Sequence, residues 1–201
     1  MAILEVKELS AGYGNGHVIQ NISFSLERGD FLCVLGRNGS GKSTLIRAAQ
    51  GLLKDRSGSV LVDGLDLSTM SPRDVARKIA YVPQLSYLPF EFCVEEVILM
   101  GRYIHQGKLS GITSTDRKVI EDIMDLTQTT ALRKKKIAHL SGGERQRVFI
   151  ARALAQDTPL VFLDEPSAHL DINYQVEIYQ ILRRLQEEKA TTVLVAEHNI
   201  N

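Results

Sequence analysis

Apolar and polar residues alternate over two stretches near the start of the chain, residues 3–9 and 17–26. Alternation with a period of two predicts strands, because successive side chains of a strand point to opposite faces. Gly12, Gly14 and Gly16 lie between the two stretches, as expected for a connection between strands. The pattern therefore predicts an antiparallel pair of strands.

Other strands are predicted from short apolar runs. Residues 31–35 form such a run between Asp30 and Gly36, which is typical of a buried parallel strand. The remaining predicted strands cover residues 58–64, 79–82, 160–163 and 191–196.

Helical spacing of apolar residues predicts helices between these strands. One helix starts at Ser43, a short one is capped by Ser71, and residues 94–100 form a third. Three longer helices are expected to present these apolar faces: Val119, Ile123 and Leu126; Val148, Ala151, Leu154 and Ala155; Tyr174, Ile178, Ile181, Leu182 and Leu185. The order of elements predicts an α/β fold with a helical subdomain inserted at residues 94–138.

Length and composition fit one domain, because 201 residues that are 44% hydrophobic can bury a sizeable core. The 24 basic residues balance 24 acidic ones, so charge gives no support to nucleic-acid binding. Cys33 and Cys93 are expected to be buried, unpaired thiols. No apolar run approaches the roughly 18 residues of a membrane span, so a soluble protein facing the cytoplasm is expected.

The strongest motif is G-x-x-x-x-G-K-S, a P-loop, at residues 36–43 between a predicted strand and a predicted helix. Backbone N–H groups of such a loop, and the helix N-terminus after it, hold phosphate charge. Lys42 would reach the terminal phosphates and Ser43 would ligate Mg²⁺. The residues predicted to bind a nucleotide here are Gly36, Asn38, Gly39, Ser40, Gly41, Lys42, Ser43 and Thr44.

Two adjacent carboxylates follow the predicted strand at residues 160–163. The carboxyl ends of strands line the crevice in which open α/β sheets bind ligands. Asp164 would hold the Mg²⁺ of the P-loop, and Glu165 would act as a base or position an attacking water.

Several features allow two interpretations. Tyr13 either stacks on a nucleobase or packs beside a hairpin. Residues 140–146 either start a helix capped by Ser141 or form a second phosphate site. His198 is either structural or a hydrogen-bond partner of a γ-phosphate. The apolar residues in the loop 85–92 are either packed or exposed for docking.

The motifs, taken in chain order, resemble those of the ATP-binding cassette ATPases: Tyr13, the P-loop, Gln84, L-S-G-G-E-R-Q from Leu140, L-D-E-P from Leu163, Asp171 and His198. The resemblance covers nearly the whole chain and implies ATP and Mg²⁺ as cofactors. It implies one domain, residues 1–201, with a RecA-like core at 31–86 and 157–201. An antiparallel β subdomain at residues 1–30 and a helical subdomain at 87–156 complete this P-loop NTPase fold.

The resemblance also implies roles within one site. Tyr13 would stack on adenine and Gln84 would link Mg²⁺ to a transmembrane partner. Glu165 would be the catalytic glutamate and His198 the switch histidine.

A second group of residues would act between two copies of the chain. Ser141, Gly142 and Gly143 would bind the γ-phosphate of ATP held by the other copy. The resemblance therefore implies a head-to-tail homodimer, with Asp171 reaching across the interface.

Within the family, the chain resembles the importers of iron-siderophore, haem, cobalamin and related metal chelates in three segments, residues 101–105, 150–156 and 167–173. The resemblance implies an ATPase at the cytoplasmic face of the membrane that powers a permease, with an extracytoplasmic binding protein upstream. A short permease helix would dock in a groove formed by Tyr87, Phe90, Phe92 and residues 97–102. An ATP-binding module with little turnover, or an ATPase of another importer class, are the alternatives.

Two departures from the family pattern concern the end of the chain. The family usually has aspartate directly after the switch histidine, whereas Asn199 follows His198 here. Glu197, directly before His198, is also unusual. Relatives continue with further strands and a helix beyond the position of Asn201. We therefore expect a shortened chain with slow hydrolysis and a loose C-terminus.

Overall fold

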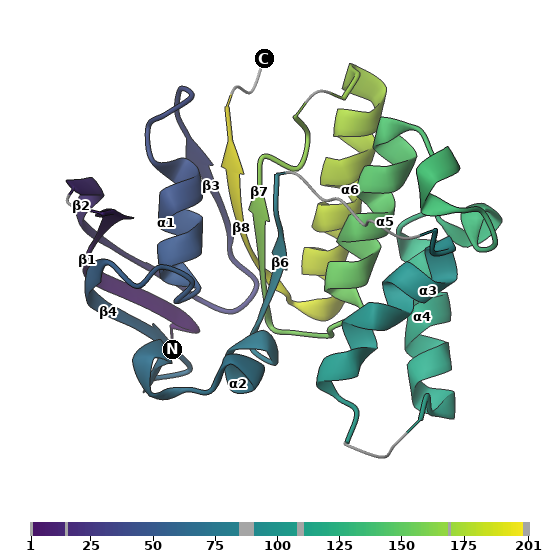
Figure 1. The fold of residues 1–201 in the computed structure, drawn as a ribbon, viewed down its shortest axis with the longest axis horizontal. Coiled ribbons are helices and arrows are strands. Elements are labelled where there is room, and N and C mark those ends of the chain that lie inside the picture. Colours follow the sequence, from purple (N-terminus) through teal and green to yellow (C-terminus); the bar gives the residue numbers. More distant parts are fainter. Residues whose placement is uncertain (1, 15, 85–90, 108–110, 169, 199–201) are drawn as a thin grey trace.

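A computed structural model describes residues 2–14, 16–84, 91–107, 111–168 and 170–198. Within these residues the chain forms two four-stranded sheets, with strand orders β2-β1-β4-β5 and β3-β8-β7-β6 (Figure 1). Helix α1 lies between the two sheets, and α5 and α6 cover the opposite face of the second sheet. None of the helices in the described part of the chain is long and apolar enough to cross a membrane.

The first sheet is antiparallel and contains β1 (Leu4–Tyr13), β2 (Gly16–Leu26), β4 (Arg56–Val62) and β5 (Leu65–Asp66). Leu4 lies opposite Leu26 and Tyr13 opposite Gly16, so the predicted N-terminal strand pair is confirmed.

The second sheet is parallel and contains β3 (Phe31–Leu35), β6 (Ile79–Val82), β7 (Leu160–Asp164) and β8 (Thr192–Glu197). Strands β7 and β8 are buried along their whole length. The prediction of a buried strand at residues 31–35 was wrong in one respect. Strand β3 is parallel to β8, but it lies at the edge of the described sheet, and Phe31 and Leu35 are exposed.

The helices are α1 (Lys42–Ala49), α2 (Pro72–Ala76), α3 (Val94–Leu99), α4 (Ser114–Leu126), α5 (Gly142–Leu154) and α6 (Ile172–Lys189). Short 3₁₀ helices are η1 (Leu67–Thr69), η2 (Met100–Ile104), η3 (Thr130–Leu132) and η4 (Ile137–His139). The predicted cap of α2 is confirmed, because the Ser71 side chain accepts a hydrogen bond from the Asp74 N–H and Pro72 occupies the first turn.

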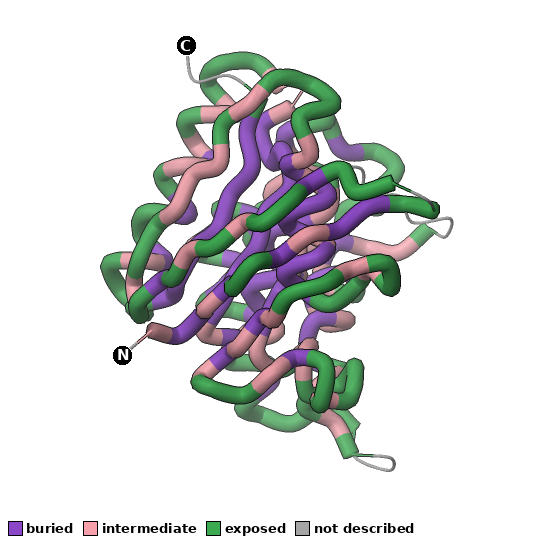
Figure 2. Tube along the Cα trace, turned by 90° about the vertical axis from the view of Figure 1, so that its left-hand side faces the viewer, coloured by how far each residue is buried: buried purple, intermediate pink, exposed green. Residues whose placement is uncertain are grey.

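Two hydrophobic clusters share the parallel sheet, which runs through the buried interior of the molecule (Figure 2). Leu160 and Phe162 of β7 pack with α1 and the antiparallel sheet. Val161 and Leu163, on the other face of the same strand, pack with α3, α4, α5 and α6. Alternate residues of one strand therefore belong to different cores.

The predicted apolar faces are correct for α5 and for most of α6, whereas that of α4 is rotated. Helix α4 buries Ile120, Ile123 and Met124, while Val119 and Leu126 are only half-buried. In α6 the residue predicted to be buried but left half-buried is Tyr174. These differences arise because neighbouring apolar residues offer two overlapping faces, and the packing partners select one.

A buried ion pair connects two parts of the helical segment. Arg102 lies with its Nε 2.9 Å from Asp116 Oδ1, and its Nη1 donates to the Ala155 carbonyl at 2.8 Å. A Cβ atom at Gly101 would lie 2.2 Å from the Arg152 carbonyl oxygen, so glycine permits this close approach of η2 to α5.

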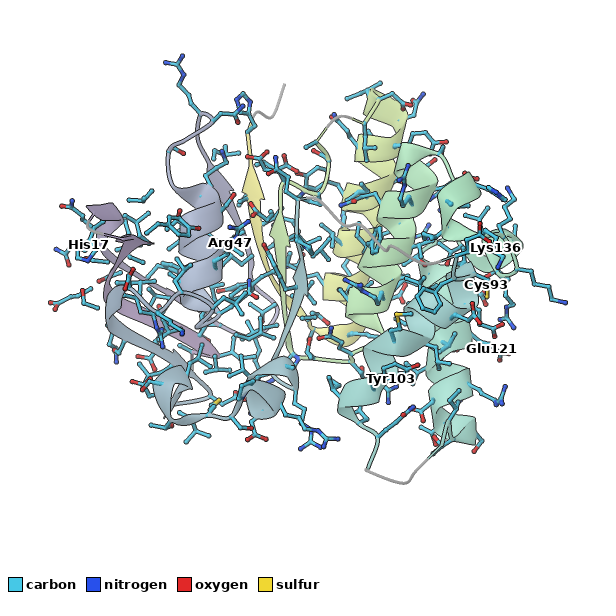
Figure 3. The ribbon with its side chains drawn as sticks, in the orientation of Figure 1. His17, Arg47, Cys93, Tyr103, Glu121 and Lys136 are labelled. Carbon is cyan, nitrogen blue, oxygen red and sulfur yellow. The ribbon has the colours of Figure 1, made fainter. Side chains whose placement is uncertain are left out.

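The cysteines and the outer surface differ partly from expectation. Cys33 and Cys93 are unpaired, as predicted, but each is half-buried rather than buried. Cys93 forms an isolated antiparallel bridge with Lys136, and Figure 3 shows both residues on the outer side of the helical segment. Residues 85–90 of the predicted apolar loop lie outside the described residues, whereas Phe92 packs against the helical core.

Candidate functional site

The P-loop connects β3 to α1, and two of its glycines adopt conformations that other residues rarely take. Gly39 has φ of 79° and Gly41 has φ of 95°. Gly41 is also the N-cap of α1, and no side chain caps this helix end. The backbone N–H groups of the first turn of α1 therefore remain available to an anion.

Lys42 is buried and its ammonium group is held from three directions. Its Nζ donates to the carbonyl oxygens of Gly36 at 2.8 Å and Arg37 at 3.2 Å. The same atom lies 3.1 Å from Glu165 Oε1. The P-loop lysine is therefore paired with one of the two carboxylates at the end of β7.

Asp164, the last residue of β7, is fully buried and faces α1. Ser43 donates its hydroxyl to Asp164 Oδ1 at 2.7 Å, and the Tyr81 hydroxyl lies 3.4 Å from Oδ2. Burial raises the pKa of the Asp164 carboxyl above its usual range. The structure thus brings together Ser43 and Asp164, two of the three residues that were predicted to bind Mg²⁺, the third being Gln84.

Glu165 turns away from the strand because its backbone is left-handed, with φ of 48°. Its N–H donates to the Ala196 carbonyl at 2.9 Å, which fixes this turn to β8. Gln84, just after β6, donates its Nε2 to Glu165 Oε2 at 2.7 Å. One carboxylate therefore contacts both the P-loop lysine and the predicted glutamine ligand.

Two pockets meet at Glu165. One, of about 300 Å³, is lined by Asn38, Gln84, Glu165, Ser167, Ala168, Gln175, Glu197 and His198. The other, of about 230 Å³, is lined by Tyr13, Val18, Gly39, Gly41, Lys42, Ser43, Thr44 and Glu165. Tyr13 is 53% exposed and His198 is exposed, so each presents its ring to solvent at the rim of the site.

The structure does not bring the predicted second phosphate site to the P-loop of the same chain. Ser141, Gly142 and Gly143 start α5, which lies across the parallel sheet from α1 (Figure 1). Ser141 accepts a hydrogen bond from the Glu144 N–H at 3.2 Å, so its helix-capping role is present. A Cβ at Gly143 would lie 2.4 Å from the Tyr174 ring.

Asp171 caps α6 and is exposed, with Oδ1 accepting from the N–H groups of Asn173 and Tyr174 at 3.1 Å and 3.2 Å. Its reach across a dimer interface stays a prediction. The cap places this carboxylate at the end of the connection that begins at Glu165.

Four residues of this region were missed by sequence reasoning. Tyr81 contacts Asp164, and Arg47 (labelled in Figure 3) donates to the Tyr13 hydroxyl at 3.3 Å. Arg47 lies one helical turn after Ser43, a spacing that could have revealed it. The other two are Ser167 and Glu197, which meet only through the fold.

Comparison with known proteins identifies the family. The ABC transporter family model matches residues 19–168. The iron(3+)-hydroxamate import ATP-binding protein FhuC of Bacillus subtilis is 35% identical over 201 residues, covering 100% of this chain and 75% of that protein. The cobalamin import ATP-binding protein BtuD of Halobacterium salinarum is 38% identical over 198 residues, covering 98% of this chain and 49% of that protein.

Solved structures agree. A putative metal-chelate type ABC transporter in an inward-facing conformation superposes with a TM-score of 0.84 at 33% identity, covering 98% of this chain and 73% of that one. A dimeric ATP-binding cassette bound to ADP and Pi gives a TM-score of 0.83 at 30% identity, covering 98% and 89%. With its P-loop, the adjacent carboxylates Asp164 and Glu165, and the L-S-G-G-E-R-Q motif at the start of α5, the chain belongs to the ABC transporter family and is an ATP-hydrolysing enzyme of that family.

Proposed function

We propose that this chain is the ATPase subunit of an importer that takes up a metal chelate of the iron-siderophore, haem or cobalamin type. The observation that carries the proposal is similarity over the whole of this chain, and over 75% of each relative, to ATP-binding proteins named for iron(3+)-hydroxamate import and achromobactin transport. FhuC of Bacillus subtilis covers 100% of the chain, and so does the achromobactin transport ATP-binding protein CbrD of Dickeya dadantii, at 36% identity.

In this proposal the P-loop binds the phosphates of ATP through backbone N–H groups and Lys42. The Lys42 ammonium group would leave the Gly36 and Arg37 carbonyls and Glu165, and would bind phosphate oxygens instead. Tyr13, at the rim of the same pocket, would stack on the adenine ring.

Mg²⁺ fits the donor set at the end of β7. Ser43 Oγ and Asp164 Oδ1 are oxygen donors 2.7 Å apart, the ligand type that a hard divalent cation prefers. Gln84 uses its Nε2 on Glu165, which leaves its amide oxygen for the same purpose. When bound, Mg²⁺ would offset charge on the β- and γ-phosphates.

Hydrolysis is assigned to the first of the two pockets, where Glu165 and His198 both lie. Glu165 would position the attacking water and accept its proton. His198 would hydrogen-bond the γ-phosphate from the end of β8. This arrangement needs the three segments that carry Gln84, Glu165 and His198 to stay together.

Two copies of the chain would form a head-to-tail dimer. Ser141, Gly142 and Gly143 lie across the parallel sheet from their own α1, so a second copy has to supply this helix start to the first copy's ATP. Asp171 would contact the partner. The dimer would bind permease subunits at the cytoplasmic face of the membrane, and an extracytoplasmic binding protein would deliver the chelate.

Uptake assays test the proposal in the organism that encodes the chain. Deleting the gene should abolish uptake of one labelled chelate among a ferric siderophore, haem and cobalamin. Expression of the native chain should restore uptake, and the Lys42→Ala variant should not. Unchanged uptake of all three chelates in the deletion strain would contradict the proposed transport role while leaving the ATPase activity intact.

A further inference from the structure

Glu197, the last residue of β8, is a buried carboxylate that the proposed reaction does not use. Glu197 is only 3% exposed, and it comes immediately before the exposed His198. Burial of a carboxylate is costly unless hydrogen bonds compensate it. Glu197 lines the same pocket as Glu165 and His198, so the contacts of its side chain affect how these two residues are positioned.

The partner that defines its role is Ser167. The Ser167 hydroxyl donates to Glu197 Oε1 at 2.8 Å, and the Ser167 N–H lies 3.3 Å from the same oxygen. Ser167 is 7% exposed and lies two residues after Glu165. These two donors from Ser167 compensate the burial of the Glu197 carboxylate.

A second hydroxyl approaches from α6. The pKa of Tyr179 on α6 is raised by burial first and then by the negative charge of Glu197. Cys33 on β3 also has a raised pKa, through burial first and then through the same charge. Both shifts agree with the position that the hydrogen bonds from Ser167 give the Glu197 side chain, against the connection that follows Glu165.

The backbone around Glu197 connects the same parts of the site. Its carbonyl accepts from the Gly36 N–H at 3.3 Å, at the start of the P-loop. The preceding carbonyl, of Ala196, accepts from the Glu165 N–H at 2.9 Å. The backbone at the end of β8 thus contacts both the P-loop and the turn at Glu165. The Glu197 side chain adds a contact with Ser167, in the connection that follows Glu165.

The far side of that connection is held by another side chain. Gln175 on α6 donates its Nε2 to the Leu170 carbonyl at 2.9 Å and lies 3.4 Å from the Ser167 carbonyl. The connection that leads from Glu165 to Asp171 is therefore fixed at Ser167 and at Leu170. Only the first of these contacts reaches the strand that carries His198.

We propose that Glu197 is a positioning residue for ATP hydrolysis. Through Ser167 it holds the connection from Glu165 to Asp171 in a fixed relation to the end of β8, and so to His198. In this role Glu197 acts through Ser167 rather than directly on the nucleotide or the attacking water. Hydrogen bonds to a charged acceptor are about twice as strong as neutral ones, which suits this contact to resist small displacements. The inference rests on the ATPase activity and is independent of the transported chelate.

Steady-state phosphate release by the isolated chain tests this role in Glu197→Gln, Ser167→Ala and the double variant. Displacement of reacting groups lowers rate more than binding, so each single variant should lose about tenfold to a hundredfold in kcat. The KM for ATP should stay within about twofold, because the P-loop is unchanged. The double variant should lose no more than the worse single variant, since both act through one contact.

Thr158→Val provides a control for stability. Thr158 is buried and donates its hydroxyl to the Leu160 carbonyl at 2.8 Å, at the opposite end of β7. Its loss should lower the melting temperature by an amount similar to Ser167→Ala, yet leave kcat unchanged. If Glu197→Gln fails to fold, the kcat of Ser167→Ala compared with that of Thr158→Val still tests the positioning role.

Three results would overturn the proposal. Native kcat in Ser167→Ala, a double variant whose losses multiply, or an equal loss of kcat in Thr158→Val would each show that the contact does not position the reacting groups. An inactive native chain would instead overturn the ATPase activity, and the positioning role with it.

Discussion

Lys42 and Glu165 form a buried ion pair, with Nζ 3.1 Å from Oε1 and both residues under 10% exposed. The P-loop lysine and the proposed catalytic carboxylate are therefore in direct contact. Phosphate oxygens can replace the carboxylate on Lys42 only if Glu165 finds another donor. Gln84, 2.7 Å from the other carboxylate oxygen, is already placed to hold it.

Substitution of Lys42 by alanine should abolish tight ATP binding, because a point charge on the terminal phosphates is lost in a buried site. Titration calorimetry with MgATP measures the effect. Lys118→Ala, on the exposed surface of α4, is a matched control that should bind ATP like the native chain. Native affinity in Lys42→Ala would remove the P-loop assignment.

The Glu165→Gln variant should bind ATP but hydrolyse it at least about 10²-fold more slowly, as expected when a general base is removed. ATP should then accumulate in a lasting dimer, visible by light scattering. Glu121→Gln, far from the site on the outer side of α4 (Figure 3), should hydrolyse ATP normally. Near-native turnover in Glu165→Gln would assign the base to another residue.

Gly143→Ala should destabilise the chain by about 1–3 kcal/mol, because its Cβ would lie 2.4 Å from the Tyr174 ring in a packed contact. The adjacent Gly142→Ala is a matched control, since its Cβ would meet Leu170 at an ordinary 3.6 Å. Urea unfolding of both variants measures the difference. Equal stability would mean that Tyr174 yields freely to a methyl group.

Acid should weaken the contact between Arg102 and Asp116. The Thr113 N–H first, then Arg102 and the Thr113 hydroxyl, lower the pKa of Asp116 from 3.8 to about 2. A lowered folded-state pKa stabilises the chain above the unfolded value, and this contribution is lost as pH falls from 3.8 to about 2. The free energy of unfolding should therefore fall over this range.

The Asp116→Asn variant should show a flatter dependence on pH and lose about 3 kcal/mol at neutral pH, since it leaves Arg102 buried without its partner. Urea unfolding at several pH values measures both effects. A variant with the native slope between pH 2 and 4 would exclude Asp116 as the titrating group.

Met100→Lys should leave ATP hydrolysis by the isolated chain intact but prevent the permease from accelerating it. Met100 is half-buried at the start of η2, within the segment proposed to dock the permease. Leu52→Lys, at a 59% exposed position after α1, is the control that should retain coupling. A large fall in melting temperature for Met100→Lys would instead mean that this side chain serves packing.

The positions of the strands and of α1, α5 and α6 could be predicted because period and turn residues specify them locally. The exposure of β3 could not, because an apolar run has the same pattern in the centre or at the edge of a sheet. The order β3-β8-β7-β6 decides it, and this order depends on contacts between residues distant in sequence.

The site shows the same division. The P-loop and the pair Asp164 and Glu165 are evident from motif and from the end of an apolar run. The ion pair of Lys42 with Glu165 joins residues that only the parallel sheet brings together. The contact of Ser167 with Glu197 spans 30 positions and has no local signal. Motifs thus predict which groups react, while the fold determines what holds them.

Strand β7 has a consequence for how damage spreads through this molecule. Its residues alternate between the two hydrophobic clusters, and its last residue is Asp164. A cavity in either cluster, beside α1 or beside α5, therefore weakens the packing of the same strand, β7. Amide hydrogens of Val161 to Leu163 should exchange with solvent only by global unfolding, whichever side is weakened. Mutations remote from ATP on both sides of the sheet would then reduce activity through one shared element.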